Sequence, residues 1–129
     1  MTDLRAMMHR HWRSVAGLLL LVLAVQGAAD WWREHQAGQL AGQIARQARP
    51  GDIELLSSTT CVFCERARRW LTQHQVPFSE CFIERDDACA ARYQALGARG
   101  TPTLVVRGQP QLGFSPEQVL NRLQRSPGA

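Results

Sequence analysis

The sequence predicts an α/β fold in which strands and helices alternate in the order βαβαββα after an N-terminal hydrophobic helix. A short apolar run at residues 53–56 leads through residues 57–60 into a Cys-Val-Phe-Cys motif that opens a helical segment. Further β-favouring runs then alternate with helical patterns as far as residue 125. Near the N-terminus, residues 14–29 carry no charge and are largely apolar. These three observations predict one small α/β domain behind a hydrophobic segment.

The first helix and the second strand of the domain have clear signals. In the segment that continues to residue 75, side chains suited to a buried face recur at i, i+3, i+7 and i+10. These side chains are Cys64, Ala67, Leu71 and His74. Val76 and Pro77 end this helix, because proline cannot continue the hydrogen-bond ladder. Residues 78–83 are rich in aromatic and β-favouring side chains, which predicts the second strand.

The next helix starts at Asp86 or Asp87, either of which can cap its N-terminus, and it ends near Gly97. Its buried face consists of Cys89, Tyr93 and Leu96. Residues 103–106 form a compact β-branched strand. Residues 107–110 then predict a turn into a short fourth strand around residues 111–113.

The last helix opens at Ser115, which is followed by a proline at the first helical position and by a glutamine three residues on. It buries Val119, Leu120 and Leu123. The domain thus spans residues 52–129, which is enough chain for one small hydrophobic core.

The motif of Cys61, Val62, Phe63 and Cys64 predicts a dithiol redox site. Cys61 falls at the start of a helix, where unpaired backbone N–H groups and the helix dipole favour a thiolate. Cys64 lies about one turn further on, within reach of a disulfide. The chemistry predicted from the residues is therefore nucleophilic attack by Cys61 on a disulfide and resolution by Cys64, which makes these two cysteines the candidate catalytic residues.

Over residues 52–125 the chain resembles the glutaredoxin family of the thioredoxin-like superfamily. Three motifs carry the resemblance: the Cys61 to Cys64 motif after a strand, Gly100-Thr101-Pro102 before the third strand, and Gly113-Phe114-Ser115-Pro116-Glu117 before the last helix. The resemblance implies a four-stranded mixed sheet flanked by helices, with a cis proline facing the dithiol. It implies a thiol-disulfide oxidoreductase acting on glutathione mixed disulfides or on protein thiols, with glutathione as a co-substrate and no bound cofactor. The substrate-binding residues that it implies are Val62, Phe63, Thr101, Pro102, Gly113, Phe114 and Ser115.

The chain departs from the family pattern at two places. Val62 stands where typical members have a proline between the cysteines. The chain contains no lysine, so it lacks the lysine that many members place before the first cysteine to pair with the glutathione carboxylate. The residues before Cys61 offer hydroxyl groups but no positive charge, so strong glutathione binding would need Arg66 or Arg99.

Two non-enzymatic alternatives stand beside the redox enzyme. A metal-binding module would use the same four cysteines, but their spacing does not give the paired motifs of a zinc ribbon, and neither His35 nor His74 lies at ligand spacing. A thioredoxin-fold adaptor tethered to a membrane would use the groove near Pro102 to hold partner proteins. A Cys-x-x-Cys pair at a helix start is an unusual choice for packing alone.

The N-terminal segment, residues 1–32, is predicted to be a membrane anchor. Tryptophan residues at both ends of the apolar stretch suit the two membrane interfaces, and three arginines precede it. The alternative is a secretory signal peptide that is cleaved near residues 27–29. Both alternatives place the domain in the periplasm, either on a single-pass inner-membrane helix or as a secreted protein. Residues 33–51 are predicted to be a weakly amphipathic juxtamembrane helix or a disordered linker.

The charge of the chain argues against one class of function, nucleic-acid binding, and two further cysteines lie outside the dithiol motif. The formal net charge is +4, but residues 52–129 hold nine arginines against eight acidic residues, which does not support nucleic-acid binding. Cys81 falls in the second strand and Cys89 on the inner face of the second helix. They could be buried free thiols, a structural disulfide that an oxidising compartment would permit, or a relay with the dithiol site.

Overall fold

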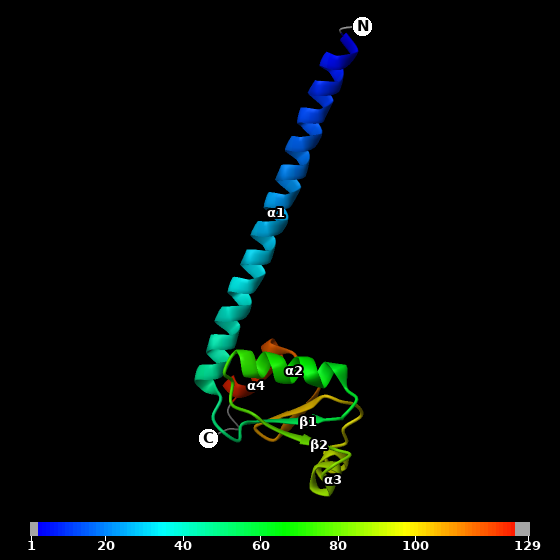
Figure 1. Ribbon diagram of the computed structural model, residues 1–129. Helices are drawn as coiled ribbons and strands as arrows, with labels where there is room; N and C mark the ends of the chain where they lie inside the picture. The colour runs from blue at the N-terminus through cyan, green and yellow to red at the C-terminus, as the bar shows by residue number, and fades with distance from the viewer. Residues whose placement is uncertain (1–2, 126–129) are drawn as a thin grey trace. The chain divides into compact units, whose positions relative to one another are not determined.

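The computed structural model describes the backbone of residues 3–125 and the side chains of residues 11–125. The predicted order of elements, βαβαββα after an N-terminal helix, is confirmed (Figure 1). The elements are α1 (Asp3–Gln47), β1 (Ile53–Ser57), α2 (Val62–Gln73), β2 (Ser79–Phe82), α3 (Asp87–Ala95), β3 (Thr103–Val106), β4 (Gln109–Leu112) and α4 (Pro116–Gln124).

The four strands form one mixed sheet in the order β2-β1-β3-β4. Strand β1 pairs in parallel with β2 and antiparallel with β3, and β3 pairs antiparallel with β4. Because β1 and β2 are parallel, their carboxyl ends meet at one edge of the sheet, and the loops that follow them lie next to each other. This arrangement brings the start of α2 close to the turn that follows β2.

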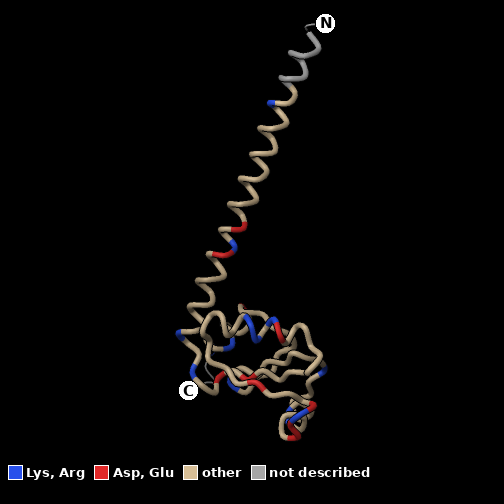
Figure 2. Tube along the Cα trace, in the orientation of Figure 1, with Lys and Arg blue, Asp and Glu red and all other residues tan. Residues whose placement is uncertain are grey.

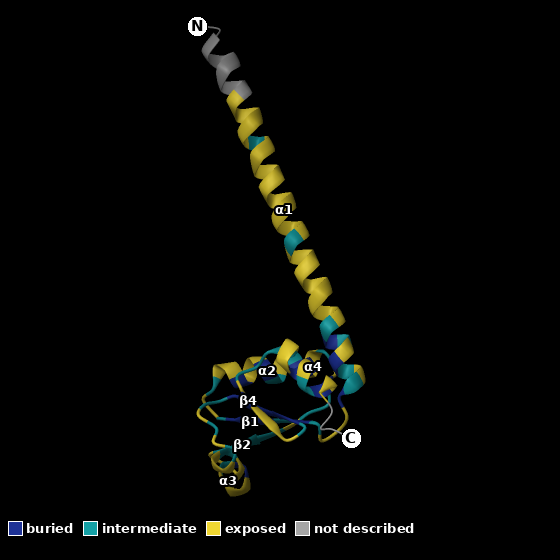
Figure 3. Cartoon of the chain, turned by 180° about the vertical axis from the view of Figure 1, so that it is seen from behind, coloured by how far each residue is buried: buried dark blue, intermediate teal, exposed yellow. Residues whose placement is uncertain are grey.

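Helices cover both faces of the sheet (Figure 3). The side chains of the strands alternate between two cores. On one face Leu55 and Leu104 pack against α2 and α4. On the other face Leu56 and Val105 pack against Cys89 of α3. The alternation explains why most residues of β1 and β3 are apolar, because a strand covered on both faces has few positions left for polar side chains.

Strand β4 begins two residues earlier than the sequence pattern predicts. Arg107 and Gly108 form the hairpin turn, with φ angles of 49° and 80°. Two consecutive residues with positive φ match the twist of a two-residue hairpin. Pro110 therefore lies in the strand and not in the turn, which a strand at the edge of a sheet permits.

The chain divides into two compact units, Met1–Ala37 and Gly38–Ala129, and helix α1 runs through the boundary. In the first unit the apolar stretch is exposed, and Figure 2 shows no charged residue along it. The segment His11–Gln47 is the one helix among the described residues that is long and apolar enough to cross a membrane. A signal sequence near an N-terminus has the same properties.

The second unit takes in the last turns of α1. Ile44 is fully buried, and Ala41 and Ala48, the residue directly after the helix, are nearly so. Ile44 and Ala48 belong to the same core cluster as Leu55 and Leu104. The end of this helix therefore contributes to the hydrophobic core of the domain.

Asp52 ties the entry of β1 to the β3–β4 hairpin. Its carboxylate accepts hydrogen bonds from the Arg49 N–H at 3.0 Å and from the Arg107 guanidinium at 3.2 Å. Burial alone would raise the pKa of Asp52, but these two hydrogen bonds and the arginine charges hold that pKa below its ordinary value of 3.8. A lowered pKa in the folded state stabilises the fold above the ordinary pKa, and this contribution disappears as the pH falls through the folded-state pKa.

We therefore expect Asp52→Asn to lower the free energy of unfolding by about 1 kcal/mol at neutral pH. The difference from the wild type should shrink as the pH falls below 3.8 and through the lowered pKa of the folded-state carboxyl. Urea denaturation followed by circular dichroism at several pH values measures both effects. A difference that stayed constant down to pH 2 would contradict the role of the charge.

Candidate active site

Cys61 lies between the loop of residues 58–60 and helix α2, and it is the N-cap residue of that helix. Its backbone is extended, with φ −93° and ψ 104°, and its N–H donates to the Ser58 carbonyl at 3.3 Å. Its sulfur accepts a hydrogen bond from the Cys64 N–H at 3.0 Å. An N–H at a helix start also favours a negative charge on that sulfur once the cysteine is reduced.

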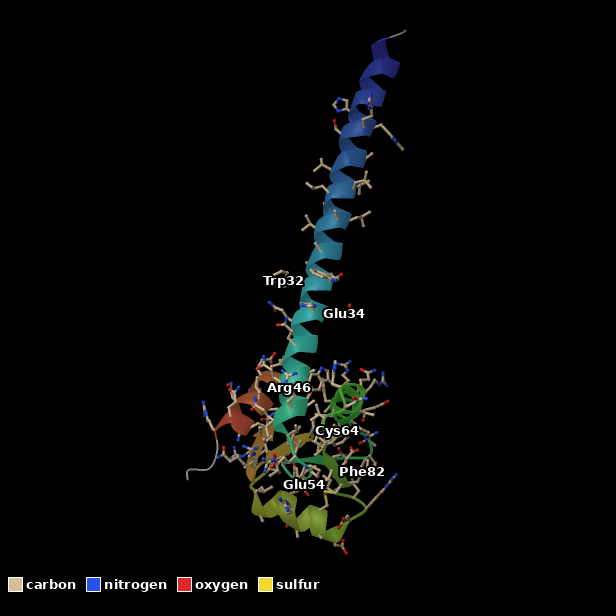
Figure 4. The ribbon with its side chains drawn as sticks, turned by 90° about the vertical axis from the view of Figure 1, so that its left-hand side faces the viewer. Trp32, Glu34, Arg46, Glu54, Cys64 and Phe82 are labelled. Atoms are coloured by element: carbon tan, nitrogen blue, oxygen red, sulfur yellow. A yellow bond between two sulfur atoms is a disulfide. The ribbon has the colours of Figure 1, made fainter. Side chains whose placement is uncertain are left out.

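Cys61 and Cys64 form a disulfide with 5.2 Å between their Cα atoms. Cys64 is fully buried on the inner side of α2, where Figure 4 labels it, whereas Cys61 is partly exposed. The more accessible sulfur is thus the one at the helix terminus. The roles of Cys61 as the cysteine that meets the substrate and of Cys64 as the resolving cysteine stay predictions.

A groove of about 500 Å³ lies beside the dithiol motif. It is lined by Phe63, Arg66, Ala67, Thr101, Pro102, Leu112, Gly113 and Phe114. Five of the seven residues that the resemblance implied for substrate binding thus line one groove. The Thr101–Pro102 peptide bond is cis, as the resemblance implied, and the Pro102 carbonyl accepts a hydrogen bond from the Gly113 N–H at 2.8 Å.

The other two residues lie elsewhere. Val62 is exposed and lines a second, smaller recess on the side of the loop that leads into α2. Ser115 caps helix α4: its hydroxyl oxygen accepts a hydrogen bond from the Gln118 N–H at 3.4 Å, and its hydroxyl donates to Glu117 at 2.8 Å. Substrate binding by all seven residues stays a prediction.

Leu112 is a groove residue that the sequence interpretation missed. Its side chain is 67% exposed, and a Cβ atom added to Gly100 would lie 3.1 Å from its Cδ1 atom. Gly100 therefore leaves room for Leu112 at the groove. The sequence of β4 gives no signal for it, because alternation of polar and apolar residues would bury Leu112 and expose Gln111, whereas the structure buries Gln111 and exposes Leu112.

The groove itself is largely apolar and carries one cation. Arg66 stands over the Phe63 ring with 5.5 Å between its guanidinium carbon and the ring centroid. Phe63 is 66% exposed although it is a large aromatic residue. An exposed apolar surface next to a disulfide is a candidate binding site.

The second recess, of about 270 Å³, is polar and borders Cys61 itself. Arg68 lies in its wall and donates two hydrogen bonds to Glu80 of β2, at 2.6 and 2.9 Å. These bonds raise the pKa of Arg68 above its ordinary value. Glu80 also accepts a hydrogen bond from the Ser57 hydroxyl at 2.5 Å. Polar contacts from β2 thus hold the last residue of β1 and one side of α2.

Cys81 and Cys89 form a second disulfide, with 6.0 Å between their Cα atoms. Of the three alternatives for this pair, the structure shows the disulfide and not buried free thiols. The bond joins β2 to the first turn of α3, next to Leu56 and Val105. Among the described residues, no group of three or more His, Cys, Asp or Glu side chains is arranged to hold a metal ion.

Comparisons with known proteins agree with this geometry. Residues 53–110 match the family model described as glutaredoxin. The glutaredoxin-like protein NrdH of Lactococcus lactis is 22% identical over 67 residues, which cover 52% of this chain and 93% of that protein. A mutant of the thioredoxin-like protein BC3987 has a similar structure, with 25% identity and a TM-score of 0.52 over 59% of this chain and 99% of that one. The chain therefore carries a glutaredoxin-like domain with a thioredoxin-like fold, and helix α1 lies outside the matched residues.

Proposed function

We propose that this chain is a thiol-disulfide oxidoreductase in which Cys61 is the nucleophile and Cys64 the resolving cysteine. One observation carries the proposal: the Cys61 sulfur lies at the start of α2, accepts the Cys64 N–H and is bonded to the Cys64 sulfur. The match of residues 53–110 to the glutaredoxin family supports it. The groove beside the motif gives a substrate a surface on which to lie.

The reaction balances as two thiol-disulfide exchanges. The Cys61 thiolate attacks one sulfur of a substrate disulfide, so a Cys61–substrate bond forms, the substrate S–S bond breaks, and the leaving thiolate takes a proton from water. The Cys64 thiolate then attacks the Cys61 sulfur and releases the second substrate thiol. The substrate has gained two electrons, and the Cys61–Cys64 disulfide holds the oxidised state. The same steps in reverse oxidise a substrate dithiol.

The groove supports protein thiols or disulfides as substrates better than it supports glutathione. Its lining is mostly apolar, with Arg66 as the one charged residue, whereas glutathione carries two carboxylates and an ammonium group. An extended protein segment with apolar side chains beside its cysteine would bury Phe63 and Leu112. Glutathione mixed disulfides remain the second substrate class within the same proposal.

Turnover of two substrates tests the proposal: a disulfide-bonded protein and a glutathione mixed disulfide, each with excess thiol reductant. We expect the wild-type chain to reduce the protein disulfide faster. Arg66→Ala should leave protein reduction within a few-fold and weaken glutathione turnover more, because it removes the groove's only cation. A chain that turned over neither substrate would overturn the proposal.

The proposal also includes a cellular location for the domain. An uncharged apolar stretch preceded by Arg13 supports a membrane anchor with the domain on the periplasmic side. The Cys81–Cys89 disulfide supports an oxidising compartment. Mass spectrometry of the mature protein, together with protease treatment of spheroplasts, would separate a retained anchor from a cleaved signal peptide. Protection of the domain in intact spheroplasts would overturn the periplasmic location.

A further inference from the structure

The turn between β2 and α3 reaches the loop of residues 58–60 through one carboxylate. Glu84 accepts a hydrogen bond from the Ser58 hydroxyl and another from the Thr59 N–H, the latter at 3.2 Å. The Ile83 N–H donates to the Ser57 carbonyl at 3.0 Å, which continues the β1–β2 pairing up to this contact. The two loops are therefore joined where the parallel strands end.

Ser58 connects Glu84 to Cys61 through two hydrogen bonds. Ser58, whose hydroxyl is bonded to Glu84, uses its carbonyl to accept the Cys61 N–H at 3.3 Å. The Cys61 sulfur in turn accepts the Cys64 N–H at 3.0 Å. A shift of Ser58 would consequently move Cys61 relative to the helix N-terminus that stabilises its thiolate.

Glu84 is itself held in place from both sides. The Phe82 carbonyl accepts the N–H groups of Arg85 and Asp86, each at 3.1 Å, which fixes the turn. The Asp86 carboxylate accepts the Cys89 N–H at 3.1 Å and caps α3. The Cys81–Cys89 disulfide closes the whole loop around Glu84.

We propose that the Cys81–Cys89 disulfide and Glu84 form one positioning unit that holds Cys61 at the start of α2 and so sets the reactivity of its sulfur. The inference rests on the proposed function of Cys61 as the nucleophile. Glu84 acts through Ser58 and Thr59 and does not touch the sulfur, so it is a positioning residue. The second disulfide acts through Glu84, because it fixes the turn that presents the carboxylate.

The test uses the full-length chain in detergent with Cys64→Ser as the parent, which leaves Cys61 as the one free thiol and keeps the second disulfide intact. The alkylation rate of Cys61 by iodoacetamide is measured from pH 4 to pH 10 to give its thiol pKa. In the parent we expect a pKa below the ordinary value for cysteine. Circular dichroism confirms that each variant is folded.

Glu84→Ala should slow alkylation at neutral pH by roughly threefold to tenfold, because a loosened Cys61 loses part of the stabilisation of its thiolate. Glu84→Gln should stay within about twofold of the parent, since the amide can accept the Thr59 N–H and donate to the Ser58 hydroxyl. Asp87→Asn is the matched control: it removes an exposed carboxylate two positions beyond Arg85 and should change nothing. If Glu84→Ala and Glu84→Gln accelerated alkylation equally, charge alone would be responsible and positioning would be overturned.

The role of the disulfide is tested by coupling. Cys81→Ser combined with Cys89→Ser should slow alkylation about as much as Glu84→Ala, and adding Glu84→Ala to that pair should cause little further loss. Additive effects would overturn the single positioning unit. An ordinary thiol pKa in the parent would overturn the proposed function, whereas a low pKa in the parent that Glu84→Ala left unchanged would overturn the positioning role alone.

Discussion

Cys61→Ser is expected to abolish turnover, with a loss of roughly 1,000-fold or more, because a serine hydroxyl does not ionise near neutral pH and cannot attack a disulfide. Cys64→Ser should keep the first attack and lose the second. The Cys64 variant should consequently accumulate a mixed disulfide between Cys61 and the substrate. Loss of the first attack and loss of the second step are expected from two cysteines whose Cα atoms lie only 5.2 Å apart. The outcomes differ because Cys61 is partly exposed at the helix terminus and Cys64 is buried.

Steady-state turnover measures the first effect, and intact mass under non-reducing conditions measures the second. The variant with both Cys81 and Cys89 changed to serine is the control, because it breaks the other disulfide, which takes no part in the exchange. Its turnover should fall only several-fold. A Cys61→Ser chain that showed no turnover in vitro but still bound the same partner proteins in cells as the wild type would favour the adaptor alternative.

The sequence predicted the sheet well because its strands have simple patterns. The strand at Thr103–Val106 is predicted with its observed bounds, since a β-branched run follows a proline and precedes a turn. Helix α3 begins after Asp86, which is one of the two capping residues that the sequence predicts. The start of β4 was predicted too late because Arg107 adopts a positive φ, which an arginine seldom does, and Pro110 suggested a turn.

The candidate site divides into a local part and a long-range part. Cys61 as the N-cap of a helix is a local property and could be predicted from adjacent residues. The contact between Glu84 and Ser58 joins positions that are 26 residues apart, and no local pattern marks it. The Cys81–Cys89 disulfide stayed one of three alternatives because its formation depends on where a strand ends and a helix begins.

The contact made by the end of helix α1 was also not predictable from a local pattern. Residues near Ile44 have helical spacing of apolar side chains, which predicted a weakly amphipathic helix but could not show what covers its apolar face. In the structure that face packs on the core of the domain, where Ile44 is 0% exposed. Because of this packing, the second compact unit begins at Gly38, before the start of the domain at residue 52 that the sequence predicts.

Ile44→Ala is expected to lower the free energy of unfolding of the domain by about 2–4 kcal/mol, the usual cost of a cavity left by a fully buried isoleucine. This is a large fraction of the stability of a small domain. Leu21→Ala is the matched control, because Leu21 lies on the same helix but is 61% exposed in the first unit. Its substitution should leave the unfolding transition of the domain unchanged.

Two truncated chains measure how much residues 38–51 as a whole contribute to the stability of the domain, beyond the side chain of Ile44. A chain that begins at Gly38 keeps the buried end of α1 and should unfold cooperatively, close to the full-length protein. A chain that begins at Asp52 loses Ile44 and Ala48 from the core cluster, uncovers apolar surface of that core, and should be largely unfolded or aggregated. Urea denaturation followed by circular dichroism measures both chains. Equal stability of the two would show that the glutaredoxin-like domain does not need the helix that precedes it.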